Sequence, residues 1–95
     1  MITNCELCER LNECNEHHLI PKTNHKNKWF KKNFTKEEMN ETIYVCVSDC
    51  HKNIHKLIED EKILGKYYNS KEKLMENENI KNYIEWIKKK PSGFD

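Results

Sequence analysis

The chain has 95 residues, of which 36% are hydrophobic and 35% are charged, and its net charge is +1. One small domain with a thin apolar core is expected, because a chain this short excludes a multidomain enzyme. No apolar signal region follows Met1, and no stretch approaches the roughly 18 to 20 apolar residues of a membrane span, so we expect a cytoplasmic protein with no membrane partner.

Five cysteines in so short a chain suggest how it is stabilised. In a reducing compartment, cysteines bind metal more readily than they form disulfides. A metal would also compensate for the small apolar surface that a domain of this size can bury.

The N-terminal part is expected to contain a metal-binding knuckle and a strand. Residues 1–14 include a Cys-x2-Cys pair, whose two intervening residues let both sulfurs turn toward one ion. Residues 13–20 can be extended, and this strand must stop near Pro21, which cannot donate to a central ladder.

Residues 22–36 form a basic segment. It carries six lysines and no acid, interleaved with histidine and aromatic side chains, and its residues 22–34 are expected to be a long loop. Lysines that neutralise phosphates release counterions, so this composition favours a nucleic-acid partner. A solvated lysine face is the alternative. The lysines expected to contact nucleic acid are Lys22, Lys26, Lys28, Lys31 and Lys32.

A short helix and the best strand signal follow. Thr35 and Glu38 have the form of a capping box, which predicts a helix as far as about Asn40. The segment 42–47 is rich in β-branched and aromatic residues, so it is expected to be a strand that pairs with the first one.

A longer helix is expected next. Ser48 or Asp49 can cap a helix over about residues 50–64, and Gly65 is expected just beyond its end. His51 and His55 lie four residues apart on this helix, which puts both imidazoles on one face, one turn apart.

Two further helices are expected in the last third of the chain. Ser70 and Asn79 can cap helices over about residues 71–77 and 80–90. The second carries apolar residues at helical spacing, at positions 80, 83, 84 and 87, and Pro91 ends it. These helices are expected to be a packing extension, with a partner-binding or DNA-backbone role as the lesser option.

Two groups of side chains have the composition of metal sites. The first is a four-thiolate set suited to a structural Zn²⁺, formed by Cys5, Cys8, Cys46 and Cys50. Its second pair is spaced Cys-x3-Cys, wider than usual. Cys14 is left over, either as a free thiol or as a replacement for one of the four. Buried cysteines without metal are the plain alternative.

The second group is formed by His17, His51 and His55 around a divalent cation. Phosphodiester hydrolysis needs such a cation to stabilise charge on the leaving oxygen, and a base near neutrality to deprotonate water. Histidine suits the role of the base, since its unperturbed pKa is about 6.5.

Three motifs carry a family resemblance. The run from Glu16 to Pro21 reads Glu-His-His-Leu-Ile-Pro, Asn40 precedes the second expected strand, and the Cys-His-x3-His motif that begins at Cys50 opens a helix. Together they resemble the HNH endonucleases, over residues 5–58. The resemblance to small stand-alone bacterial HNH proteins extends nearly from end to end.

The resemblance implies an α+β fold with one nuclease domain over residues 1–95. Its ββα-metal core would span about 5–64 and contain a zinc knuckle, and a C-terminal helical extension would span about 66–90. The implied activity is hydrolysis of phosphodiester bonds in DNA, with 5′-phosphate and 3′-hydroxyl products.

The resemblance also implies roles for particular residues. His17, with His51 and His55, would hold the catalytic cation, which can be Mg²⁺, Mn²⁺, Ni²⁺ or Zn²⁺. His18 would be the general base. Asn40 would brace the loop between the strands and so orient the base, and the four cysteines would match the zinc-containing branch of the family.

The adjacent histidines set a geometric condition. Neighbouring residues of a regular strand point to opposite faces, so His17 and His18 cannot both approach one phosphate from such a strand. We therefore predict either a bulge at this pair or a strand that ends there.

Two other classes of function fit part of the pattern. A non-catalytic, zinc-stabilised nucleic-acid-binding module would keep the cysteines and the basic segment, but would not need His18 beside His17. In a structural or interaction protein, the C-terminal helices would be the working surface.

Overall fold

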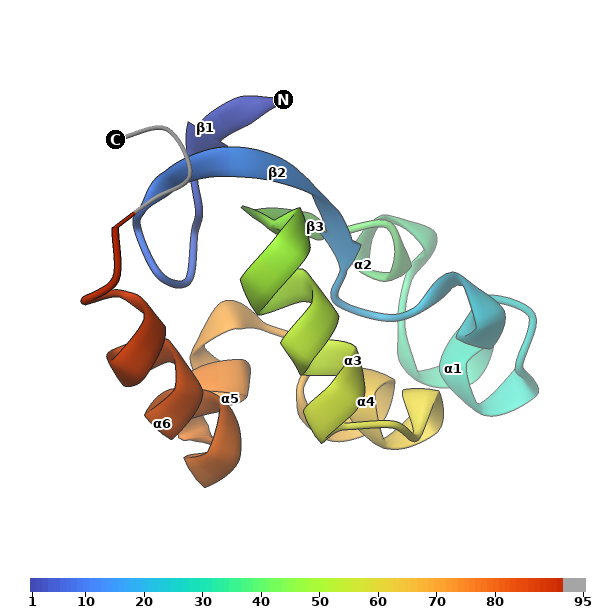
Figure 1. The fold of residues 1–95 in the computed structure, drawn as a ribbon. Helices are drawn as coiled ribbons and strands as arrows, with labels where there is room; N and C mark the ends of the chain where they lie inside the picture. The colour runs from blue at the N-terminus through green and yellow to red at the C-terminus, as the bar shows by residue number, and fades with distance from the viewer. Residues whose placement is uncertain (92–95) are drawn as a thin grey trace.

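A three-stranded antiparallel sheet organises the α+β fold. The computed structural model describes residues 1–91. The strands are β1 (Ile2–Asn4), β2 (Leu11–His18) and β3 (Thr42–Cys46), in the spatial order β1-β2-β3. The expected pairing of the two longer strands is confirmed, with His17 opposite Ile43, and β1 is an additional strand that the sequence did not indicate. The helices formed by residues 52–87 lie together on one side of this sheet (Figure 1).

The basic segment is more ordered than the expected long loop. It contains a 3-10 turn, η1 (Lys22–Asn24), and a helix, α1 (Lys28–Asn33), so the prediction of a loop over 22–34 is wrong. The signal overlooked was Asn27, whose side chain accepts from the backbone N–H of Trp29 and caps α1. The capping box at Thr35 is confirmed, and it starts the short helix α2 (Lys36–Met39).

The prediction of a single helix over residues 50–64 is also wrong. The chain forms a π-helical turn, η2 (Val47–His51), then α3 (Lys52–Leu57), and after a break it forms α4 (Glu61–Tyr67). Ile58 leaves the helical region at φ −124° and ψ 84°, and the Asp60 side chain then accepts from Lys62 N–H and caps α4. A local cap therefore competes successfully with continuation of the helix.

Gly65 lies inside α4 and not beyond a helix end. A Cβ at this position would come within 2.8 Å of Asn24 Nδ2 and 2.9 Å of Phe30 Cε1. Asn24 is itself buried and donates to the Glu61 carbonyl at 2.8 Å. The missing side chain thus allows α4 to pack closely against η1 and α1.

The last two helices form the expected extension. Ser70 caps α5 (Lys71–Glu76), as predicted, whereas α6 (Glu78–Ile87) is capped by Asn77 and not by Asn79. The helix begins two residues earlier than expected because the Asn77 side chain accepts from the N–H of Ile80. The apolar stripe is confirmed, since Ile80, Ile84 and Ile87 are buried, and α6 packs against α3.

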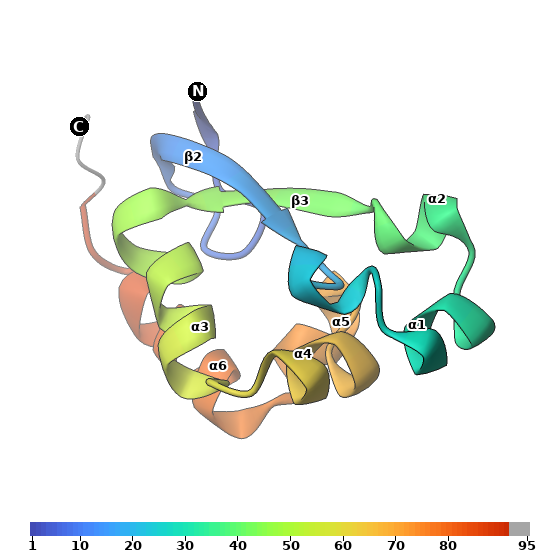
Figure 2. The same ribbon diagram turned by 90° about the vertical axis from the view of Figure 1, so that its right-hand side faces the viewer.

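Two apolar clusters hold these elements. The larger contains all five cysteines and the inward residues of β3, α3, α5 and α6. The smaller consists of Ile20, Phe30 and Met39, with Phe34 packed against them, and it joins α1 to α2 at one end of the molecule (Figure 2). Within residues 1–91, no helix is both long and apolar enough to cross a bilayer.

Candidate metal centres

Four buried cysteines converge where the sheet meets the π-helical turn. Cys5 and Cys8 come from the connection between β1 and β2, Cys46 ends β3, and Cys50 lies in η2. Their sulfurs all lie within 4.8 Å of one another, and the Cys8 and Cys46 sulfurs are 3.9 Å apart. Tetrahedral zinc with Zn–S bonds of about 2.3 Å requires sulfurs about 3.8 Å apart. The cluster can therefore hold a structural metal such as zinc.

The π-helical turn explains how the wide Cys-x3-Cys spacing is accommodated. A π-helix carries more residues per turn than an α-helix, so one additional residue fits between Cys46 and Cys50. The turn also brings backbone donors to the sulfurs: Cys50 N–H donates to Cys46 Sγ at 3.2 Å, and Cys46 N–H to Cys5 Sγ at 3.4 Å. Such bonds favour thiolate ligands.

Hydrogen bonds among the four sulfurs change how readily each thiol loses its proton. Hydrogen bonding with Cys46 lowers the pKa of Cys5 to about 6, and it also lowers the pKa of Cys8. The pKa of Cys46 is raised by Cys5, and that of Cys50 by Cys46. Four thiolates this close repel one another, so the thiols with a raised pKa would keep their protons without a metal. A bound divalent cation would allow them to ionise.

Arg10 covers one side of the cysteine cluster. Its Nε lies 3.3 Å from Cys8 Sγ and its Nη2 lies 3.8 Å from Cys46 Sγ. The same Nη2 donates to Asp49 Oδ2 at 2.7 Å, and Nη1 donates to the Pro91 carbonyl at 3.2 Å. Arg10 is thus a positive charge beside a group of sulfurs that would carry negative charge.

Cys14 is buried but lies outside the four-cysteine group. Its thiol donates to the carbonyls of Thr3 and Asn12, each at 3.5 Å. Burial raises its pKa, which favours the neutral thiol. This geometry corresponds to the free-thiol alternative.

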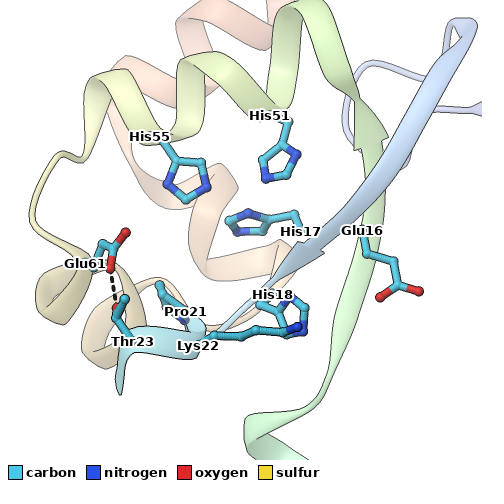
Figure 3. Close-up of a pocket in the computed structure, with 9 residues that line it drawn as sticks. All are labelled: Glu16, His17, His18, Pro21, Lys22, Thr23, His51, His55 and Glu61. Carbon is cyan, nitrogen blue, oxygen red and sulfur yellow. Dashed lines mark hydrogen bonds between the residues drawn. The ribbon is translucent and has the colours of Figure 1, made fainter. Parts of the chain in front are cut away.

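Three histidines form the second cluster. His17 points from β2 toward His51 and His55, which lie one turn apart at the end of η2 and in α3 (Figure 3). The centroid of the His17 ring is 5.2 Å from that of His51 and 5.3 Å from that of His55. One nitrogen from each ring lies within 4.8 Å of the other two, so the three side chains could hold one cation.

His17 is the most informative member of the cluster. It is 1% exposed, and neither of its ring nitrogens has a hydrogen-bond partner among residues 1–91. Burial, followed by the neighbouring imidazoles of His51 and His55, lowers its pKa to about 3. A buried polar group without a partner is costly. A neutral imidazole is also the form that binds metal, so the donor set fits a divalent cation.

Asn15 orients His51. Its Oδ1 lies 2.6 Å from His51 Nδ1; an amide oxygen only accepts, so Nδ1 is the donor, and Nε2 is left as the nitrogen that could bind a metal. Burial, followed by His55, lowers the pKa of His51 and also favours the neutral ring. Asn15 lies two residues before His17 and so shares its face of β2, a signal that sequence reasoning missed.

His18 lies at the point where β2 ends, as the geometric condition required. Pairing with β3 is regular as far as His18 and Thr42, so no bulge is needed. His17 and His18 lie on opposite sides of the strand end, yet both line one pocket of about 270 Å³ (Figure 3). Burial lowers the pKa of His18, and Lys22 and His25 lower it further.

Glu61 reaches the histidine pocket from α4, a contribution that sequence reasoning missed. It lines the pocket opposite the histidines and accepts a hydrogen bond from Thr23 Oγ1. No local pattern could have indicated it, because the break between α3 and α4 decides where this side chain points.

The other candidate residues are not all at this pocket. Lys22 lines it, whereas Lys31 and Asn40 line a second pocket between η1, α1 and α2. Lys26, Lys28 and Lys32 are exposed. Asn40 is exposed at the end of α2, and no hydrogen bond of its side chain is found within residues 1–91.

Comparison of the chain with family models, with curated proteins and with solved structures finds no significant match. The class that fold and site define is therefore a small α+β protein with a four-cysteine cluster able to hold a structural metal.

Proposed function

We propose that this protein is a metal-dependent endonuclease of the HNH type, which hydrolyses phosphodiester bonds in DNA. The observation that carries the proposal is His17, buried and without a hydrogen-bond partner in the described chain, facing His51 and His55. A zinc-stabilised module that only bound nucleic acid would need no such cluster beside His18. The succession of β2, β3 and α3 supports a ββα-metal core.

The two adjacent histidines have different tasks in this proposal. His17, His51 and His55 would hold the divalent cation, with Mg²⁺, Mn²⁺, Ni²⁺ and Zn²⁺ as candidates. When bound, this cation supplies charge stabilisation at the scissile phosphate. His18, neutral because burial lowers its pKa, accepts a proton from water. The water oxygen then bonds to phosphorus, the bond from phosphorus to the 3′ oxygen breaks, and the departing oxygen takes a proton from solvent, which yields a 5′-phosphate and a 3′-hydroxyl.

The segment around Asn40 is a candidate for positioning the base. Glu41, its neighbour, accepts a backbone hydrogen bond from Leu19 N–H at 3.2 Å, directly after His18. Asn40 would act through this connection between the end of β2 and the start of β3. The bracing role remains a proposal.

The structural zinc and the lysines complete the proposal. Zinc on the four cysteines would fix Cys50, and therefore also the adjacent His51. The lysines of residues 22–36 would contact the phosphate backbone, which carries little sequence information. Weak sequence preference and a steep fall in affinity with salt are expected.

A comparison of two neighbouring substitutions tests the proposal. Three zinc-loaded proteins are compared: the wild type, His17→Ala and His18→Ala. Each is incubated with supercoiled plasmid and either Mg²⁺ or Mn²⁺, and the nicked circles are quantified. Co²⁺ binding at the histidine site is followed by visible absorption. His18→Ala should bind Co²⁺ like the wild type but lose nicking by a factor of about 100 or more. His17→Ala should lose both.

The two readouts separate catalysis from metal binding. Undiminished nicking by His18→Ala would refute the assigned base. DNA binding by the wild-type protein without nicking, under each of the four divalent metals, would favour a nucleic-acid-binding module instead.

A further inference from the structure

A second pocket lies beside the histidine pocket and is not used by the proposed hydrolysis. It has a volume of about 500 Å³ and lies between η1, α1 and α2. This volume is within the roughly 300–1,000 Å³ typical of sites for small molecules. The residues that line it include His25, Lys31, Phe34, Lys36, Met39 and Asn40.

The chemistry of this lining suits a nucleotide. Phe34 is half-buried and stacks on the buried Phe30, with ring centroids 6.0 Å apart and an interplanar angle of 25°, so it provides a firm aromatic surface. Lys31 and Lys36 are exposed, and none of the acidic residues within 1–91 lines the pocket. A planar apolar group that carries a negative charge is complementary to this combination, because bases stack on aromatic rings while lysines bind phosphate.

One residue of each pocket lies close to the other pocket. His25 lines the second pocket, and the centroid of its ring is 6.1 Å from that of His18 in the first. Its Nε2 lies 2.9 Å from the Ile20 carbonyl, and this contact restrains the ring near His18. The two pockets are therefore close enough for one nucleic-acid strand to place a phosphate at His18 and a neighbouring nucleotide beside His25.

We propose that this pocket binds one unstacked nucleobase of single-stranded DNA, with the adjacent phosphate on Lys31 and Lys36. Phe34 is the stacking surface, and the side-chain amide of Asn40 is a donor and acceptor for the edge of the base. The inference rests on the proposed function and names its substrate class, which is DNA that is unpaired next to the scissile phosphate. A paired base would first have to be extruded from the duplex.

The test uses two unlabelled ligands that differ only in their bases. A hexamer of thymidylate and a hexamer of abasic deoxyribose phosphates carry the same number of phosphates. Each is titrated into the zinc-loaded, ¹⁵N-labelled full chain without added divalent cation, and amide shifts are followed by NMR. The wild-type protein should bind the thymidylate hexamer about tenfold more tightly, with the base-dependent shifts around residues 31–40.

Substitutions at the aromatic surface make the test specific. Phe34→Leu should abolish the difference between the two ligands, whereas Phe34→Tyr should retain it. Equal affinity of the wild-type protein for both hexamers would overturn the proposal, as would a difference that survives Phe34→Leu. If Phe34→Leu does not fold, the position of the wild-type shifts decides: base-dependent shifts that all lie outside residues 31–40 would overturn the proposal.

A charge-matched pair of variants tests the phosphate contacts. One double variant carries Lys31→Gln and Lys36→Gln. The control double variant carries Lys71→Gln and Lys81→Gln, which removes the same charge from α5 and α6. The first should weaken binding of the thymidylate hexamer several-fold more than the control. Equal weakening by both pairs would overturn the phosphate contacts. None of these measurements involves cleavage, so failure of the pocket and failure of the nuclease proposal are distinguishable.

Discussion

Replacing Arg10 by alanine should destabilise the zinc-loaded protein by about 2 kcal/mol. The Arg10 side chain is 8% exposed and lies 2.7 Å from Asp49, whose side chain is 29% exposed. A hydrogen bond between charged groups contributes about 1.5–3 kcal/mol. Partial exposure of Asp49 reduces this value, because water would solvate its carboxylate after the substitution. Loss of the contacts to Cys8 and Cys46 adds to the effect, since the thiolates then lose a nearby positive charge.

Urea unfolding at a fixed excess of zinc measures this prediction, because bound metal itself stabilises the folded state. With a slope of roughly 1–3 kcal/mol per molar urea, the midpoint should fall by about 0.7–2 M. Arg10→Lys, which keeps the charge but loses the planar fork, should be intermediate. Release of zinc to a colorimetric chelator should be faster in Arg10→Ala.

Lys88→Ala is the matched control for a cation at the surface. Lys88 lies 3.7 Å from Glu9, and the two side chains are 47% and 75% exposed. Such a pair contributes about 0–1 kcal/mol, so this variant should unfold close to the wild type. If Arg10→Ala is no less stable than Lys88→Ala and releases zinc at the same rate, Arg10 does not stabilise the cysteine cluster.

Three further predictions concern the metal sites and the packing of α4. Cys50→Ser should abolish tight zinc binding, as measured by mass spectrometry under native conditions, whereas Cys14→Ser should retain one zinc per chain; loss of zinc from Cys14→Ser would contradict the four-cysteine assignment. Asn15→Ala should weaken Co²⁺ binding at the histidine site by about 10–100-fold, because His51 loses its orienting partner, and unchanged affinity would exclude that role. Gly65→Ala should destabilise the chain, since crowding against Asn24 costs about 1–3 kcal/mol, whereas alanine regains only about 1 kcal/mol of helix propensity. A melting temperature at or above that of the wild type would refute this.

Local sequence signals were reliable where a few neighbouring residues decide the structure. The capping box at Thr35, the cap at Ser70 and the β-branched strand before Cys46 all form as expected. Each depends on contacts within three or four residues, or on a backbone preference, and both are present in the sequence.

Local sequence signals gave wrong predictions where two local structures compete. The continuous apolar pattern through residues 50–64 favours one helix, but Asp60 caps a new helix and Ile58 leaves the old one. Gly65 resembles a helix terminator by its identity alone. Only the close approach of Asn24 and Phe30 explains why glycine lies inside α4.

The sequence by itself determined the donor set: which residues carry sulfur or imidazole, and that His51 and His55 share a helix face. The tertiary structure decided how these donors are used. Strand pairing and the π-helical turn bring Cys5 and Cys8 to Cys46 and Cys50, and the end of β2 lets His17 and His18 line one pocket from opposite sides of the strand. The partners Arg10, Asn15 and Glu61, and the pocket between α1 and α2, depend on contacts between distant segments, which local spacing does not encode.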